Sequence, residues 1–91
     1  MTAEVASQIR ERLAAALQPV RLSVRDDSHL HAGHAGAREG GHYHVTIAAE
    51  AFRGRPPLAR HRLVYDALAG LMPGRIHALS IDATLPENPA P

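Results

Sequence analysis

The chain has 91 residues, a formal net charge of +1 and no cysteine. A chain of this length forms one small domain, which hides only about 60% of its unfolded surface and leaves no room for a deep catalytic cavity beside its core. The nearly neutral charge is not that of a dedicated polyanion binder. The lack of cysteine excludes disulfides, a nucleophilic thiol and an iron–sulfur cluster held by the chain's own thiolates. No apolar run approaches the ~20 residues of a membrane span, and none follows a basic start, so we expect a cytoplasmic protein without membrane contact.

The first half of the chain predicts one helix and two strands. A helix is expected over residues 3–17, with Thr2 as its N-cap and Pro19 forcing the chain out of it. Period-two alternation then predicts half-buried strands over residues 20–25 and 42–49. The apolar face of the helix comprises Val5, Ile9, Leu13, Ala16 and Leu17.

The second half predicts a short turn, a long helix and a third strand. Residues 50–55 form the turn, with Phe52 as its core contact. A helix is expected over residues 58–72, ended by Pro73-Gly74, and a strand over residues 76–81 follows. The apolar stripe of the helix comprises Leu58, Val64, Tyr65, Leu68, Leu71 and Met72, and on the strand His77, Leu79 and Ile81 share one face while Ile76, Ala78 and Ser80 share the other.

The predicted order is therefore helix, strand, strand, short helix, long helix, strand. We expect a single small α/β domain of the α+β type, in which a three-stranded mixed sheet is covered by helices on one face. The first two strands pair antiparallel, and the third returns through a helical crossover and runs parallel to one of them. Residues 1–85 should form the domain, and residues 86–91, with three prolines, a flexible tail.

A long loop between the first two strands contains His29, His31 and His34. Loops beyond about 12–15 residues in a compact domain are usually functional or disordered. Neutral imidazole ligates iron, zinc and copper, although most loop histidines are simply solvated. His77 opens a strand whose face is otherwise apolar, and a half-buried histidine bonded to backbone is the alternative to a ligand there. Asp26-Asp27-Ser28-His29 lacks the fixed geometry that catalysis requires, so we expect no enzyme.

Four arginines precede the first acidic residue of the long helix, Asp66. The two helical segments around them are arranged in sequence like a helix-turn-helix, so binding of double-stranded DNA is one reading of this cluster. A solvated helical face is the other. The four residues are Arg53, Arg55, Arg60 and Arg62.

Several motifs resemble those of the BolA family, and the resemblance extends from the first helix to Leu85. It implies a fold similar to the second type of KH domain. The motifs are Val24-Arg25-Asp26-Asp27-Ser28 before the loop, His42-Tyr43 in the second strand, Arg60-His61-Arg62 leading into Val64-Tyr65, and Ile76-His77-Ala78-Leu79.

The resemblance also implies a function. BolA-like proteins pair with monothiol glutaredoxins, and the pair can share a two-iron two-sulfur cluster in iron–sulfur cluster handling or in iron and stress signalling. The ligands implied for this chain are His77 and a loop histidine; position matching after Asp26-Asp27-Ser28 favours His31, with His34 as a competitor. The alternative is a DNA-binding transcriptional regulator that uses the arginine cluster. No small-molecule substrate is expected in either case.

Overall fold

The structure is a computed structural model that describes residues 2–27, 41–72, 74 and 76–87. The order of its elements confirms the predicted one, except that the long helix is divided into an α-helix and a 3-10 turn. The elements are α1 (Thr2–Leu17), β1 (Arg21–Asp26), β2 (Gly41–Ala48), η3 (Glu50–Phe52), α2 (Pro57–Ala67), η4 (Ala69–Leu71) and β3 (Ile76–Thr84).

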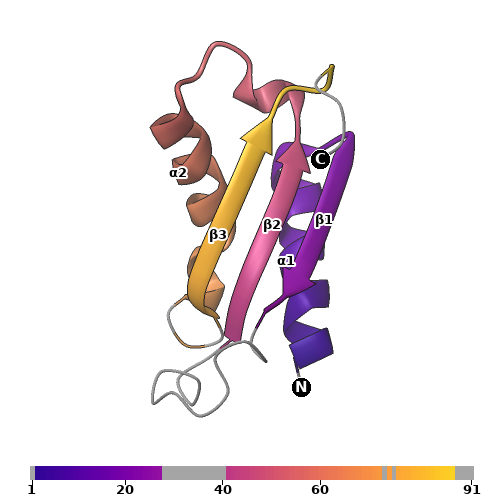
Figure 1. The fold of residues 1–91 in the computed structure, drawn as a ribbon, viewed down its shortest axis with the longest axis vertical. Coiled ribbons are helices and arrows are strands. Elements are labelled where there is room, and N and C mark those ends of the chain that lie inside the picture. The colour runs from indigo at the N-terminus through magenta and orange to yellow at the C-terminus, as the bar shows by residue number, and fades with distance from the viewer. Residues whose placement is uncertain (1, 28–40, 73, 75, 88–91) are drawn as a thin grey trace.

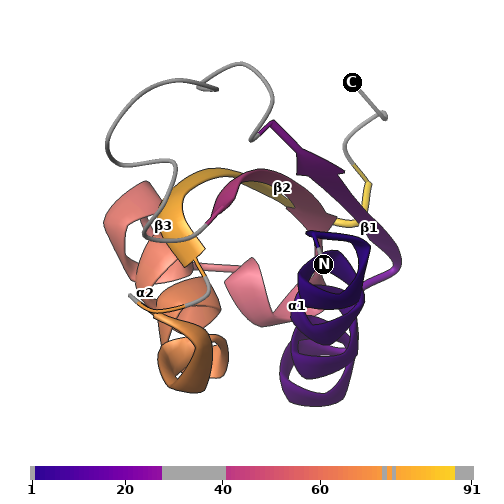
Figure 2. The ribbon, with the colours of Figure 1, turned by 90° about the horizontal axis from the view of Figure 1, so that it is seen from below.

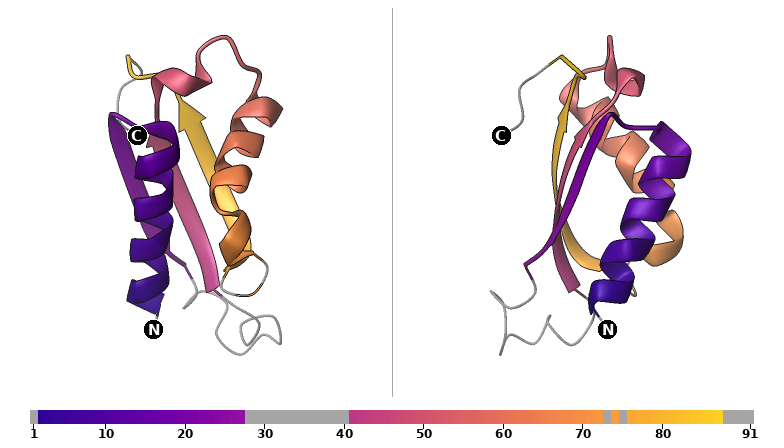
Figure 3. Two further views of the ribbon diagram at one scale, coloured as in Figure 1. Left: turned by 180° about the vertical axis from the view of Figure 1, so that it is seen from behind. Right: turned by 90° about the vertical axis from the view of Figure 1, so that its right-hand side faces the viewer.

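The sheet has three strands in the order β1-β2-β3, with β2 in the centre (Figure 1). β1 pairs antiparallel with β2, and β3 pairs parallel with β2, so the predicted mixed sheet is confirmed. Both α-helices lie on the same face of the sheet, as the view along the strands in Figure 2 shows. Among the described residues, no helix lies over the opposite face (Figure 3, right). This arrangement gives the domain one apolar layer between helices and sheet.

The core lies between the two helices and the covered face of the sheet. Alternation along β2 places Tyr43, Val45 and Ile47 in this layer, with exposed fractions of 2%, 0% and 0%. The predicted short turn is confirmed as η3, whose Phe52 is fully buried. The helices contribute the rest of the layer, chiefly Val5, Ile9 and Leu13 from α1 and Val64, Leu68 and Leu71 from α2 and η4.

The long helix differs from its prediction in two ways. α2 ends at Ala67, because the backbone N–H of Leu68 donates to the carbonyls of both Val64 and Tyr65 and the chain continues as a 3-10 turn. Leu58 and Tyr65 are not part of the buried stripe; they are 66% and 40% exposed. Because successive helical residues are about 100° apart around the axis, Tyr65 points well away from the buried direction of Val64.

The start of β3 also differs from the predicted alternation. Ile76 was expected on the face opposite Leu79, yet it is fully buried in the same core against which Leu79 packs. The cause is a register irregularity: Gly41 pairs with Ile76, and the next residue of β2, His42, pairs with Ala78. His77 is therefore the extra residue of a bulge-like step, which changes the alternation on either side of it.

Candidate functional site

Three strand ends meet at one edge of the sheet, at the lower end of Figure 1. β1 ends beside the start of β2, where Asp26 pairs with Tyr43 and the backbone N–H of Asp27 donates to the carbonyl of His42 at 2.7 Å. β3 begins at the same edge because it runs parallel to β2. Gly41, which follows segment 28–40, pairs with Ile76 at the start of β3, whereas Asp27, which precedes the segment, lies at the same end of the sheet on the other side of β2.

Only one of the three predicted ligands is among the residues that the structure describes. The backbone of His77 lies at this edge, in the irregular step of β3. His31 and His34 lie outside the described residues. Among the side chains that the structure describes, no group of three or more histidine, cysteine, aspartate or glutamate residues could hold a metal ion. The assignment of His77, His31 and His34 as ligands therefore stays a prediction.

Tyr43, part of the His42-Tyr43 motif, packs over Gly41 and forms the packed base of this edge. Tyr43 is buried, and burial, followed by the charge of Asp26, raises the pKa of its phenol, so the ring is neutral at physiological pH. The ring lies over Gly41, where a Cβ atom would be only 2.7 Å from both Cζ and Oη of Tyr43. The signal in the sequence was a glycine two residues before a buried aromatic, which marks a close approach to backbone.

Gly41→Ala should therefore destabilise the domain. The added methyl group forces Tyr43 out of its position, and overpacking of this kind costs roughly 1–3 kcal/mol. Gly74→Ala is the matched control, because no described atom beyond its chain neighbours lies within 4 Å of its Cβ position. That control should lose nothing and can gain up to about 1 kcal/mol through the unfolded state. Urea unfolding of both variants measures the difference, and equal stabilities would show that Tyr43 moves aside freely.

The arginine cluster is largely engaged within the domain. Arg53 forms ion pairs with Glu50 at 2.5 Å and Glu87 at 2.7 Å. These hydrogen bonds hold the pKa of Arg53 above, and those of both carboxyl groups below, their usual values. Arg60 donates from Nε to the carbonyl of Arg55 at 2.8 Å and from Nη1 to that of Ala83 at 3.1 Å.

The cluster also lacks a helix-turn-helix shape. The segment preceding α2 is η3, a 3-10 helix of three residues, too short to act as the first helix of such a motif. Arg55 donates from Nε to the carbonyl of Ala51, and Arg62 is exposed. The geometry thus gives no support to the DNA-binding alternative for Arg53, Arg55, Arg60 and Arg62.

Arg60→Gln should lower the stability of the domain, whereas Arg62→Gln should not, because Arg60 bonds to backbone carbonyls and Arg62 is exposed. Arg60 joins α2 to Ala83, near the end of β3. Loss of its hydrogen bonds to backbone carbonyls should cost about 1 kcal/mol. Arg62→Gln removes the same charge from the exposed surface and should change stability by less than about 0.5 kcal/mol. Denaturant melts of the two variants test this; a larger loss for Arg62→Gln would contradict the assignment.

The first residues of the predicted tail contact the domain. Arg21 donates from Nη1 to the carbonyl of Pro86 at 3.2 Å, and Glu87 pairs with Arg53. Residues 88–91 lie outside the described range, so the division at residue 85 stays a prediction. Of the helices that the structure describes, none combines the length and the apolar composition needed to cross a membrane.

Comparison with known proteins identifies the family. A family model described as "BolA-like protein" matches residues 13–88. SufE-like protein 1 of Arabidopsis thaliana is 42% identical over 85 residues, which cover 87% of this chain and 23% of that protein. BolA-like protein 1 of Mus musculus is 42% identical over 89 residues, covering 93% of this chain and 64% of that protein. The chain thus spans less than two thirds of the length of either relative.

Solved structures show the same relationship. The structure of BolA1 from Arabidopsis thaliana superposes with a TM-score of 0.80 at 42% identity, covering 92% of this chain and 95% of that one. The BolA domain of SufE1 from the same plant superposes with a TM-score of 0.77 at 46% identity, covering 90% of this chain and 92% of that one. Since both the sequence and the whole fold match, the chain belongs to the BolA-like family.

Proposed function

We propose that the chain is a non-enzymatic partner of a monothiol glutaredoxin and shares a two-iron two-sulfur cluster with it, in iron–sulfur cluster handling or iron and stress signalling in the cytoplasm. The observation that carries this proposal is the shared sheet edge. There the backbone of His77 lies at the same end of the sheet as the two strand ends that bound the histidine-rich segment, and Gly41, which follows that segment, pairs with Ile76 next to His77. This placement supports a site that takes one donor from β3 and one from the segment.

The donor chemistry fits such a cluster. Imidazole nitrogens ligate iron, and in Rieske centres two histidines replace two cysteines on one iron, which raises the reduction potential. In this chain His77 would be the donor from the strand, and His31 or His34 the donor from the loop. The chain has no cysteine, so the thiolates would come from the cysteine of the partner and from glutathione.

Membership of the BolA-like family supports the same proposed function. One relative that contains a domain of this family is named SufE-like protein 1, and this name suggests a link to iron–sulfur chemistry. Tyr43 packs closely over Gly41 at this edge, and such packing suits a ligand that must hold its position. Ordered supporting contacts of this kind set the geometry of metal ligands in general.

The experiment is co-expression with a monothiol glutaredoxin, followed by absorption spectroscopy of the purified pair. We expect a one-to-one heterocomplex with a visible cluster spectrum that differs from the spectrum of the glutaredoxin homodimer. A heterocomplex that forms without any cluster would reduce the proposal to a cluster-free interaction. Absence of any complex would contradict it altogether.

A further inference from the structure

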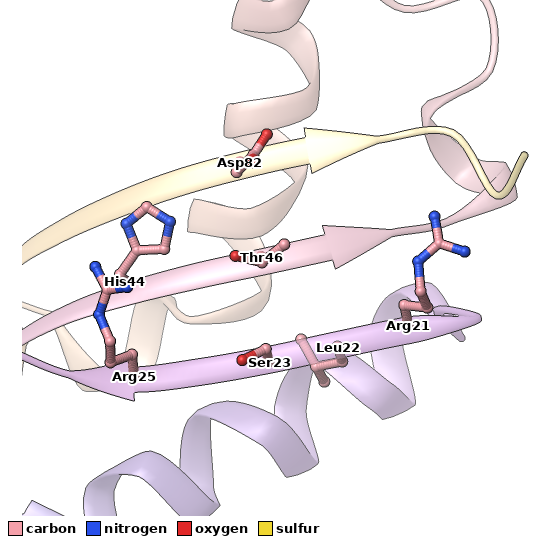
Figure 4. Close-up of a pocket in the computed structure, with 7 residues that line it drawn as sticks. All are labelled: Arg21, Leu22, Ser23, Arg25, His44, Thr46 and Asp82. Carbon is pink, nitrogen blue, oxygen red and sulfur yellow. The ribbon is translucent and has the colours of Figure 1, made fainter. Parts of the chain in front are cut away.

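The uncovered face of the sheet contains a hollow of about 650 Å³. It lies on the side of the sheet opposite the helices, and all but one of its lining residues are polar (Figure 4). Most of its lining residues come from alternate positions of the three strands, which is why they face away from the core. They are Arg21, Leu22, Ser23 and Arg25 of β1, His44 and Thr46 of β2, and Asp82 of β3.

The strand register arranges these side chains in rows. Ser23 pairs with Thr46, and Thr46 pairs with Asp82, so a hydroxyl, a hydroxyl and a carboxylate cross the sheet side by side. Arg25 pairs with His44 in the neighbouring row. Cationic groups thus line the β1 side of the hollow, and a carboxylate lines its β3 side (Figure 4).

Arg25 is held in position rather than free to rotate. Its Nε donates to Oδ1 of Asp27 at 2.7 Å and its Nη2 donates to Oδ2 at 3.1 Å. A guanidinium has five N–H donors, so this bidentate pair leaves its Nη1 edge able to donate to a second carboxylate. The carboxylate of Asp27 offsets much of the charge of Arg25. Arg21, at the other end of β1, contributes a second cation to the lining of the hollow.

The remaining lining groups are also available. Within the described part of the chain, the side chains of His44, Thr46 and Asp82 form none of the hydrogen bonds or ion pairs found there. The hollow therefore presents donors on one side, an acceptor on the other, and a hydroxyl in between. Opposite charges on opposite sides of one hollow are complementary to a dipolar ligand rather than to a simple anion.

We propose that this face binds a short zwitterionic peptide, as a ligand and not a substrate, with its carboxylate toward Arg25 and its ammonium toward Asp82. Arg25 and Asp82 lie two strand spacings and two residues apart, which is about 12 Å between their backbones. Three extended residues span roughly the same distance, at about 3.3–3.6 Å each. The inference is independent of cluster binding, because it uses neither His77 nor the loop.

Triglycine is the probe, and a titration followed by backbone amide shifts of the full chain is the measurement. We expect saturable shifts along β1, β2 and β3 at the hollow. N-acetyl-triglycine, which lacks the ammonium, and triglycine amide, which lacks the carboxylate, should each bind roughly threefold to tenfold more weakly, as expected for one exposed charge contact.

Variants assign each end of the peptide. Asp82→Asn should abolish the preference for triglycine over N-acetyl-triglycine. Arg25→Gln should abolish the preference for triglycine over triglycine amide. Asp66→Asn and Arg62→Gln make the same charge changes on exposed positions of α2 and should leave both preferences unchanged. Equal shifts with all three peptides, acetate binding as tightly as triglycine, or equal weakening in the α2 controls would overturn the proposal.

Discussion

Leu68→Ala should lower the free energy of unfolding by roughly 2–5 kcal/mol, the range for buried leucine truncations that leave a cavity. Leu68 is fully buried at the junction of α2 and η4. Its backbone N–H bonds to two carbonyls of α2 and its own carbonyl accepts from Leu71, so the local backbone resists collapse into the space left behind. A small domain has only about 5–15 kcal/mol in total, so the effect should be large.

Leu58→Ala is the matched control for this experiment. Leu58 lies on the same helix, but it is 66% exposed, so its truncation should change stability by less than about 0.5 kcal/mol. Urea or guanidinium melts of both variants give the comparison. A loss below about 1 kcal/mol for Leu68→Ala, or similar losses for both variants, would mean that the core is not organised around this junction.

The elements with a strong period were predictable from the sequence. The alternation over residues 42–49 predicted a half-buried strand, and Tyr43, Val45 and Ile47 form its buried face in β2 because side chains of a strand alternate between its two faces. The helical spacing of Val5, Ile9 and Leu13 identified the buried face of α1 for the corresponding reason. The mixed sheet then followed from the connections, since a parallel pair needs a crossover, whereas the sequence left open which of the first two strands runs parallel to β3.

The irregular features were not predictable. The bulge-like step at His77 reverses the alternation of Ile76, and a single extra residue in a strand leaves no periodic signal. The contacts of Arg53 with Glu87 and of Arg60 with Ala83 join residues 34 and 23 positions apart, so only the folded chain shows that these arginines are engaged. A charge run in the sequence looks the same whether it is solvated, paired or bound to phosphate.

For the candidate site, the sequence predicted His77 and a loop histidine as ligands, and this assignment stays a prediction. In the structure the start of β3 lies at the end of the sheet where β1 ends and β2 begins. The choice between His31 and His34 could not be made from the sequence, because residues 28–40 have no periodic apolar pattern. The variants His31→Ala and His34→Ala, alone and together, resolve that choice functionally.

His77→Ala should remove the donor from β3 while leaving the fold and the association with glutaredoxin largely intact. The fold should survive because the fully buried core residues, including the neighbouring Ile76, all remain. The cluster of the heterocomplex should become labile or revert to the spectrum of a glutaredoxin homodimer, because a histidine bound to iron has no substitute at this position in the strand. His31→Ala should have a milder effect if His34 takes its place, and the double loop variant should match His77→Ala.

His44→Ala is the control, since His44 lies on β2 but faces the hollow of the uncovered sheet face rather than the edge. Its heterocomplex should keep the wild-type spectrum. The deciding measurement is visible absorption and circular dichroism of the reconstituted heterocomplex, with the lifetime of the cluster followed in the same samples. If the cluster is shared, His77→Ala should have an altered spectrum and a shorter cluster lifetime, and His44→Ala should have neither. An unchanged spectrum and an unchanged lifetime in His77→Ala would contradict the ligand assignment and leave an interaction module that binds glutaredoxin without a shared cluster.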